Sequence, residues 1–344
     1  MAGAMIRAVI LNDTRGDRHF GCDRVMRVID ENLARRGIVV IGRSLVRRDW
    51  ERDAAFLARL AEADLIVING EGTLHHGSKQ AEKLLRVATH PARGSKPVAL
   101  INTIFQDNPP RWKDYLDRID IIGARDSKSA AAIRELTDRP VMVVPDLSLA
   151  EGTLTPLTDV VRRGILVGDS VDRRTGQALR TLARQLPEAQ FLPILRYLKP
   201  SKPHYPAPLW LAREAYLALH AAWNGWRDGN IVFNTNEAGF IRSLQGTRLH
   251  VTGRFHAVCF CLFTRTPFLA VASNSWKTAE LLADFGLGTD RIMTVGEIGE
   301  ALAHGGDFDF SEEEHEKITA GLAMASERAA DLFDRIAALA EGRP

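Results

Sequence analysis

The chain has 344 residues, of which 45% are hydrophobic and 26% are charged, and its formal net charge is +2. A chain of this length and composition has enough apolar residues for two cores, so we expect two domains. A net charge so close to zero argues against a protein whose main partner is a nucleic acid.

The sequence also indicates the cellular compartment. No segment approaches the roughly 18 consecutive apolar residues of a membrane-spanning helix, and the N-terminus lacks the apolar centre of a signal peptide. Cys22, Cys259 and Cys261 form no metal-type Cys-x-x-Cys pair, so we expect buried free thiols. We therefore expect a cytoplasmic protein that makes, at most, a peripheral contact with the inner face of the membrane.

Strands and helices alternate through the first half of the chain. The helix expected at 22–36 carries Val25, Met26, Ile29 and Leu33 at helical spacing. We expect strands at 6–11, 38–41, 64–69, 98–101, 119–124 and 141–144, and helices at 22–36, 50–63, 79–89, 112–116 and 128–135. Such alternation predicts a parallel sheet with helices on both faces.

The second half repeats this pattern after the polar segment 151–163. We expect strands at 165–167, 190–194, 231–233, 251–253 and 268–271, and helices at 175–186, 209–223, 237–244, 278–285 and 311–339, with another helix directly after 253. The prediction is an α/β protein with two doubly wound, Rossmann-like domains that face each other across a cleft. Residues 1–155 form the N-terminal domain, and residues 160–344 form the C-terminal domain with its long last helix.

The most informative motif is Gly253-Arg254-Phe255-His256, where a short apolar strand opens through glycine into a helix. The guanidinium of Arg254 matches a carboxylate or a phosphate, and His256 exchanges a proton near neutral pH. Lys277 follows the next strand, and neighbouring parallel strands would bring all three side chains to one edge of the sheet. The motif indicates anion-binding acid/base chemistry. The alternatives are an ion-paired structural Arg254, a helix-capping His256 and a solvated Lys277.

Several motifs occur in the same order as in a known family. They are Gly16-Asp17, Gly70-Glu71-Gly72, Ala124-Arg125-Asp126 with Ser129, Pro145-Asp146, Gly253-Arg254-Phe255-His256 and Lys277. In these motifs the chain resembles the polysaccharide pyruvyl transferase family over most of its length, and the Gly-Arg-Phe-His block is the most specific of them.

The resemblance implies a GT-B-like architecture and the transfer of a pyruvyl group from phosphoenolpyruvate to two hydroxyls of a saccharide, which releases phosphate. It implies that Arg254, with Gly253, binds phosphoenolpyruvate, that Arg125 and Lys277 are further donor-binding cations, and that His256 acts on the donor. His256 is the candidate general acid because C3 of the enol must be protonated. Lys277 is assigned to catalysis as well. Phosphoenolpyruvate is a substrate, and no cofactor is expected.

In a GT-B-like arrangement the N-terminal domain is expected to bind the acceptor. Asp17, His19, Glu71, His75 and His76 would orient sugar hydroxyls there or remove their protons. The paired histidines also raise a metal site, but no third and fourth ligands can be identified, so no metal is predicted. The expected partner is a saccharide or a lipid-linked glycan of capsule, exopolysaccharide or cell-wall synthesis.

A basic and aromatic region could hold a lipid-linked glycan near a membrane. It comprises Lys199, Lys202, His204, Tyr205, Trp210, Trp223 and Trp226. Packing of these tryptophans in the core is the simpler expectation.

Two other functions stay open at this point. A GT-B glycosyltransferase with a sugar nucleotide donor needs an acidic residue for the ribose, and Glu237 or Glu280 is available. A non-catalytic saccharide-binding or assembly protein of the same fold is the other, although the cationic set of Arg254, His256 and Lys277 argues against it.

Overall fold

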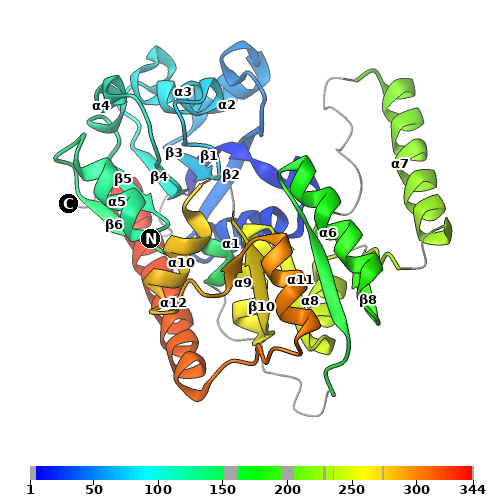
Figure 1. Cartoon of the computed structure of the whole chain (residues 1–344). Helices are drawn as coiled ribbons and strands as arrows, with labels where there is room; N and C mark the ends of the chain where they lie inside the picture. Colours follow the sequence, from blue (N-terminus) through cyan, green and yellow to red (C-terminus); the bar gives the residue numbers. More distant parts are fainter. Residues whose placement is uncertain are drawn as a thin grey trace. The chain divides into compact units, whose positions relative to one another are not determined.

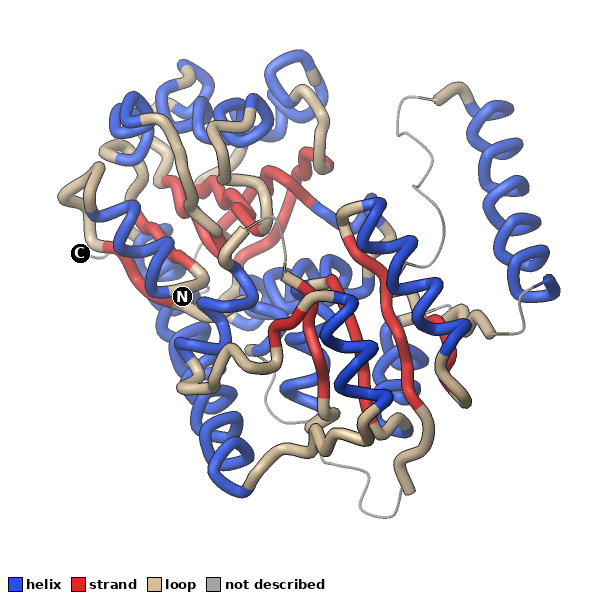
Figure 2. The backbone as a smooth tube through the Cα atoms, in the orientation of Figure 1, coloured by secondary structure: helices blue, strands red, loops and turns tan. Residues whose placement is uncertain are grey.

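The computed structural model describes residues 5–150, 161–195, 205–227, 230–234, 236–272 and 275–342. The chain divides into two compact units, and each contains one parallel sheet. The first unit comprises Met1–Gly16, Val25–Glu151 and Ala323–Pro344, and the second comprises Asp17–Arg24 and Gly152–Leu322. Figures 1 and 2 show the strands of each sheet flanked by helices.

The first sheet has six strands in the order β2-β1-β3-β4-β5-β6, and all of its strand pairs are parallel. The strands are β1 (Ile6–Asp13), β2 (Ile38–Leu45), β3 (Leu65–Glu71), β4 (Val98–Thr103), β5 (Ile121–Ala124) and β6 (Val141–Val143). The helices are α1 (Phe20–Arg35), α2 (Ala54–Glu62), α3 (Lys79–Leu85), α4 (Lys113–Leu116) and α5 (Ser127–Arg134).

Alternation along the strands explains why this sheet is covered on both faces. Val9 of β1 packs in one core with Phe56 of α2, whereas its neighbour Ala8 packs in the opposite core with Met26 of α1. The second of these cores also receives Phe333 from the last helix of the chain. A buried parallel sheet of this kind places its loops, and hence its polar side chains, at the ends of the strands.

The second sheet has five parallel strands in the order β11-β10-β9-β7-β8. They are β7 (Ile165–Ser170), β8 (Ala189–Phe191), β9 (Leu249–Gly253), β10 (Phe268–Val271) and β11 (Ile292–Met293). The helices are α6 (Arg173–Gln185), α7 (Ala207–Arg227), α8 (Glu237–Gly246), α9 (Phe255–Thr264), α10 (Lys277–Asp284), α11 (Val295–Ala303) and α12 (Glu312–Ala340). The central strand, β9, leads directly into the fully buried helix α9.

The expected fold class is confirmed, because both halves form parallel α/β sheets. Two local expectations need correction. The strand expected at 231–233 is reduced to an isolated bridge between Ile231 and Phe191, since only the two hydrogen bonds of Phe191 with Asn230 and Val232 form there. Helix α11 was not anticipated, although the capping box formed by Thr294 and Glu297 at its start is a sequence signal.

The division into compact units differs from the two contiguous domains expected at 1–155 and 160–344. Asp17–Arg24 belongs to the second unit and Ala323–Pro344 to the first, so α1 and α12 each contribute to both units. Apolar residues continue at helical spacing along the whole of α12, with Ile318 and Leu322 in one unit and Ala329 and Phe333 in the other. One uninterrupted helix can therefore supply both cores.

Two tryptophans of α7 lie at the surface. Trp210 and Trp223 are exposed, together with Leu209, Leu211 and Leu219 of the same helix, so the expectation that these tryptophans pack in the core is wrong. Lys199, Lys202 and His204 lie outside the described residues, and so does the side chain of Trp226.

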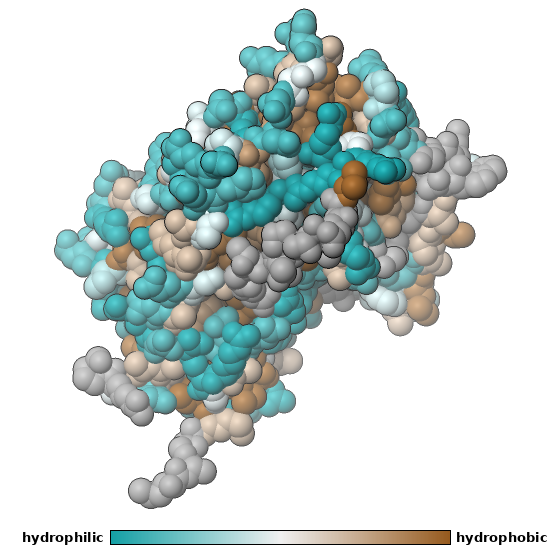
Figure 3. Space-filling model, turned by 90° about the horizontal axis from the view of Figure 1, so that it is seen from below, coloured by the Kyte–Doolittle hydropathy of each residue, from teal (hydrophilic) through white to brown (hydrophobic). Residues whose placement is uncertain are grey.

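Other surface features agree with the composition. Within the part of the chain that the structure describes, no helix combines the length and apolar character needed to cross a bilayer. Hydrophilic residues predominate on the face drawn in Figure 3, with apolar residues between them. All three cysteines are free and buried, as expected.

We predict that Phe333→Ala destabilises the protein by about 3–5 kcal/mol, because the side chain is fully buried in the first unit and its loss leaves a cavity. Urea unfolding would measure the change. The matched control is Glu327→Ala on the exposed face of α12, which should change the free energy of unfolding by less than about 0.5 kcal/mol. Equal effects of the two substitutions would show that the end of α12 does not pack in this core.

Candidate functional site

The end of β9 is the centre of the site in the second unit. Arg254 is the N-cap residue of α9, and its backbone N–H donates to Oγ1 of Thr252 at 3.1 Å. Gly253 lies against β7, where a Cβ atom would come within 2.6 Å of Cβ of Ser170. A residue with a side chain would therefore push the two strands apart at the point where Arg254 leaves the sheet.

The guanidinium of Arg254 is held by Asp169, near the end of β7. Nε and Nη2 of Arg254 donate to Oδ2 of Asp169 at 2.8 and 2.5 Å, and the two side chains are only 16% and 14% exposed. The other carboxylate oxygen of Asp169 accepts the backbone N–H of Ile194 at 3.1 Å. The ion pair confirms that Arg254 has a structural partner, and because Nη1 takes no part in it, one side of the guanidinium stays available in this pair for an anion.

His256 lies in the first turn of α9, buried to 7% exposure. His19 and Cys22, both also 7% exposed, surround it from the start of α1, and the rings of His19 and His256 are 5.2 Å apart between centroids. One donor atom from each of these three residues lies within 4.8 Å of the other two. Within the residues that the structure describes, this is the group of side chains whose spacing would suit a metal ion.

A hydrogen bond at His19 argues against a metal there. Nδ1 of His19 accepts the backbone N–H of Gly21 at 3.1 Å, so in the neutral ring the proton is on Nε2. A metal-binding histidine does the reverse, since its second nitrogen normally donates a hydrogen bond. The cluster is therefore better described as the residues that pack around His256 than as a metal site.

Lys277 opens α10, which follows β10. Strands β9 and β10 are parallel neighbours, as the sequence predicts, so Arg254, His256 and Lys277 all follow the carboxyl edge of one sheet. Lys277 is half-buried, and residues 273 and 274 before it lie outside the described residues.

Arg125 lies in the first unit, after β5. Nη1 of Arg125 is 3.6 Å from a carboxylate oxygen of Asp146, and both side chains are almost completely buried. Asp126 caps α5 by accepting the backbone N–H of Ser129 at 2.6 Å, and the hydroxyl of Ser129 accepts the N–H of Phe105. The Arg-Asp motif and Asp146 thus form one buried polar group that fixes the ends of β5 and β6.

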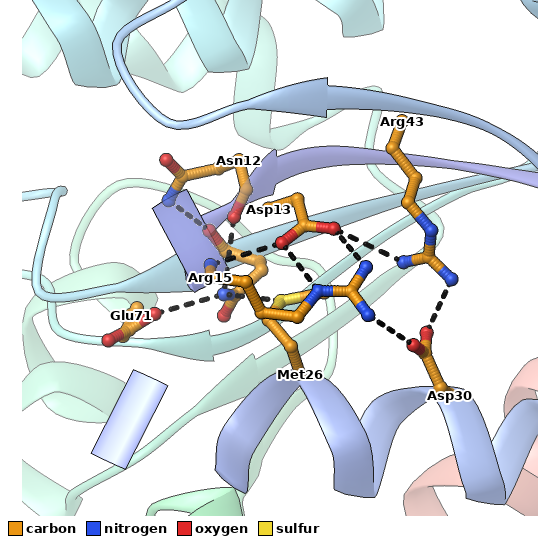
Figure 4. Close-up of polar contacts among 8 residues, drawn as sticks. Asn12, Asp13, Arg15, Met26, Asp30, Arg43 and Glu71 are labelled. Atoms are coloured by element: carbon orange, nitrogen blue, oxygen red, sulfur yellow. Dashed lines mark hydrogen bonds and ion pairs between the residues drawn. The ribbon is translucent and has the colours of Figure 1, made fainter. Parts of the chain in front are cut away.

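Glu71 ends β3 in a second polar group of the first unit. Figure 4 shows Glu71 and Asn12 of β1. The side-chain amide of Asn69 donates to the Glu71 carboxylate at 3.1 Å. The amide of Asn12 donates to the backbone oxygen of Asn69 at 2.7 Å. Asn12, Glu71 and Asn102 have positive φ angles of 65°, 38° and 55°, although none is glycine. Backbone strain of this kind is concentrated at functional sites, here at the carboxyl edge of the first sheet.

A neighbouring ion-pair network in Figure 4 is structural. Arg15 and Arg43 both contact the buried carboxylate of Asp13, and both also bind Asp30 of α1, at 3.1 and 2.7 Å. Two carboxylates thereby balance two guanidinium groups, so this network fixes the turn after β1 and has no excess charge for a ligand.

The five residues expected to bind the acceptor do not all lie in the same unit. Glu71, His75 and His76 belong to the first unit, whereas Asp17 and His19 belong to the second. The rings of His75 and His76 are 5.0 Å apart, and Nδ1 of His76 is 3.3 Å from the exposed carboxylate of Asp107. His19 lies against His256 in the second unit, and its expected role in acceptor binding stays a prediction.

The sequence of residues 12–275 matches the family described as polysaccharide pyruvyl transferase. The chain belongs to the polysaccharide pyruvyl transferase family. A comparison with curated protein sequences gives no significant match.

Solved structures show the fold that this family member shares. It is similar to a UDP-glucosyltransferase from Polygonum tinctorium that glucosylates indoxyl, with a TM-score of 0.51, 10% identity and coverage of 99% of this chain and 100% of the other. It is also similar to a UDP-GlcNAc 2-epimerase from Neisseria meningitidis, with a TM-score of 0.50, 10% identity and coverage of 96% of this chain and 99% of the other. For an α-glucosyltransferase in complex with UDP and DNA, the TM-score is 0.50, the identity is 11%, and the coverage is 97% of this chain and 100% of the other. The pyruvyl transferase family member therefore has a GT-B-like fold.

Sequence reasoning missed three residues of the site in the second unit. Asp169 follows the predicted strand at 165–167, so its position at a strand end was a usable signal. Cys22 gave no signal, because its contact with His256 joins residues far apart in the chain. His250 also went unnoticed on β9, where it is fully buried.

Burial lowers the pKa of His250 to about 4, because the charged ring loses its hydration there. The unfolded chain, with a histidine pKa of about 6.5, then binds more protons than the folded protein between these two values. We predict that acidification from about pH 6.5 to about pH 4 costs the wild type about 3 kcal/mol more than His250→Leu. Urea unfolding across this range would measure the difference, and parallel pH profiles would contradict it.

Proposed function

We propose that the protein transfers a pyruvyl group from phosphoenolpyruvate to a saccharide of capsule, exopolysaccharide or cell-wall synthesis. The observation that carries the proposal is the position of Arg254 and His256 at the start of α9, in a chain of this family. The backbone N–H groups of a first helical turn and a fixed guanidinium both favour an anion. Phosphoenolpyruvate supplies a carboxylate and a phosphate on a small frame.

In the proposed reaction His256 donates a proton to C3 of the enol, and positive charge develops at C2. One sugar hydroxyl then bonds to C2 and loses its proton, the bond from C2 to the phosphate oxygen breaks, and a second hydroxyl closes the ketal with loss of its proton. Phosphate leaves with the bonding electrons. Arg254 and Lys277 would stabilise the charge on the donor and the leaving phosphate, as cations fixed in place do.

The roles of the two units follow from this assignment. The second unit would bind the donor, and the first would bind the acceptor through Glu71, His75 and His76. Glu71 carries the strongest support, because it lies in a buried polar group with a strained backbone. The expectation from the family motif that Arg125 also binds the donor stays a prediction, because Arg125 lies in the first unit and its guanidinium is buried beside Asp146.

We predict that phosphoenolpyruvate at a hundredfold excess over its dissociation constant stabilises the wild type by about 2.7 kcal/mol. Arg254→Ala should abolish this stabilisation because it removes the fixed guanidinium. The control is Arg248→Ala, an exposed arginine just before β9, which should respond as the wild type does. The measurement is thermal unfolding with phosphoenolpyruvate and with a panel of sugar nucleotides.

The outcomes separate the candidate functions. Stabilisation by phosphoenolpyruvate that requires Arg254, followed by phosphate release with a suitable saccharide, supports pyruvyl transfer. A response to a sugar nucleotide alone would replace it with glycosyl transfer, the activity named for two glucosyltransferases of similar fold. No response to either donor would favour a non-catalytic saccharide-binding protein.

A lipid-linked acceptor would also bring the protein to the membrane, and α7 has the side chains for such a contact. Leu209, Trp210, Leu211, Leu219 and Trp223 are exposed on this helix. Aromatic and aliphatic side chains of this kind enter the interface between lipid headgroups and acyl chains.

We predict that the protein binds vesicles containing anionic lipid and that Trp210→Ser with Trp223→Ser weakens binding by at least about tenfold, since burying one large apolar side chain contributes about 1.5–3 kcal/mol. Vesicle flotation measures the binding. The control is Val171→Ser, an exposed apolar residue outside α7. Wild-type protein that stays unbound would favour an acceptor free of lipid.

A further inference from the structure

The imidazole of His256 packs against a short segment from the start of α1. This segment, His19 to Cys22, belongs to the second unit although it follows the first strand of the first sheet. The segment touches the residue that the proposed reaction uses as its acid, so the contacts that hold it there bear on catalysis.

Gly21 lies directly against the ring of His256. A Cβ atom on Gly21 would lie 2.2 Å from Cγ, 2.3 Å from Cβ and 2.7 Å from Nδ1 of His256. These distances are far shorter than any that non-bonded carbon atoms adopt, so a side chain at position 21 must displace the ring. His256 therefore leaves room only for a glycine at position 21.

His19 packs against the ring of His256 as well. As the residue before α1, it caps the helix through the hydrogen bond from the Gly21 N–H to Nδ1, and its ring meets that of His256 at an interplanar angle of 63°. The capping bond fixes both the ring orientation and the tautomer of His19, with the proton on Nε2. His19 therefore presents a constant face to His256.

Contacts of Phe20 and Arg24 are among those that hold the wider segment Asp17–Arg24 in the second unit. The backbone N–H of Phe20 donates to the oxygen of Ile194 at 3.4 Å, and the ring of Phe20 packs on Phe240 with centroids 5.3 Å apart. Arg24 pairs with Glu237 at 2.8 Å. Ile194 is in turn the residue whose N–H binds Asp169, the partner of Arg254. The packing around His256 and the orientation of Arg254 therefore both depend on contacts of Ile194.

We propose that Gly21 and His19 are positioning residues for His256, and that the segment Asp17–Arg24 belongs to the donor side of the enzyme. The proposal rests on the proposed function, in which His256 transfers a proton. A proton donor has to be held at a fixed distance and angle from the atom it protonates, and displacement by about 1 Å reduces a rate by about a hundredfold.

Gly21→Ala tests the packing. We expect kcat for ketal formation to fall by about a hundredfold, with stabilisation by phosphoenolpyruvate retained, because the atoms nearest to a Cβ at position 21 belong to His256. The control is Gly176→Ala in α6, where a Cβ atom finds its nearest neighbours at an ordinary 3.8 Å. An unchanged kcat in Gly21→Ala, or equal losses in both variants, overturns the role of Gly21.

His19→Asn and His19→Ala separate positioning from helix capping. Asparagine keeps an oxygen where Nδ1 accepts the Gly21 N–H, so His19→Asn should keep the stability of the wild type and still lose kcat. His19→Ala should lose both. If His19→Asn had wild-type kcat, His19 would be a capping residue only.

A third measurement does not depend on turnover. In protein labelled at the histidine rings, the His256 signals, assigned by their loss in His256→Gln, should shift in Gly21→Ala and in His19→Asn and stay unchanged in Gly176→Ala. This result would stand even if phosphoenolpyruvate failed to bind, so failure of the proposed function and failure of the positioning role are distinguishable. Unshifted signals would overturn the positioning role.

Equilibrium dialysis with Zn²⁺ provides a second way to overturn it. Suppose that the wild type binds Zn²⁺ stoichiometrically and that His19→Asn and Cys22→Ser both abolish this binding. His19 would then supply a lone pair to the metal, which is incompatible with a proton on its Nε2 and a hydrogen bond at its Nδ1. Absence of such binding supports the positioning role.

Discussion

The ion pair between Arg254 and Asp169 is the interaction on which the site in the second unit depends. It joins the ends of two neighbouring strands, and it forms because Gly253 lets β9 lie close to Ser170 of β7. Asp169 also binds the backbone of Ile194, which holds the start of α1. Four segments that are distant in sequence are therefore fixed by one carboxylate. A charged pair at partial exposure suits this task, since full burial would add a large desolvation cost.

Comparison of the two arginines of the family motifs shows why their environments differ. Arg125 and Asp146 are almost completely buried, and such a pair gives little net stability but strongly penalises the loss of either partner. Arg254 and Asp169 remain partly exposed, and Asp169 engages only one side of the guanidinium. The first pair is suited to fixing the ends of two strands, and the second is suited to binding an anion while keeping its orientation.

The sequence alone predicted the strands of both sheets except the two-residue β11, because buried parallel strands are short apolar runs and the helices between them show regular spacing. It also predicted that Arg254, His256 and Lys277 follow neighbouring parallel strands, which end at the same edge of the sheet. It could not place His19, because the contact with His256 spans most of the chain and leaves no local pattern. It also could not divide α12 between two cores, because an apolar stripe does not reveal which sheet it covers. The pairing of Asp169 with Arg254 was predictable only in part. Both residues follow predicted strands, but no pattern in the sequence joins them.

The electrostatics of the His19, Cys22 and His256 cluster favour an anion over a cation. Cys22 and His256 lie in the first turns of α1 and α9, where the positive ends of the helix dipoles meet. Arg254, two residues before His256, keeps Nη1 outside its pair with Asp169, and His19 already uses its accepting nitrogen to cap α1. A divalent cation would have to overcome all three effects, whereas an anionic substrate gains from the first two. The same residues whose spacing resembles a metal site are therefore, by helix dipole and by tautomer, better suited to an anion than to a cation.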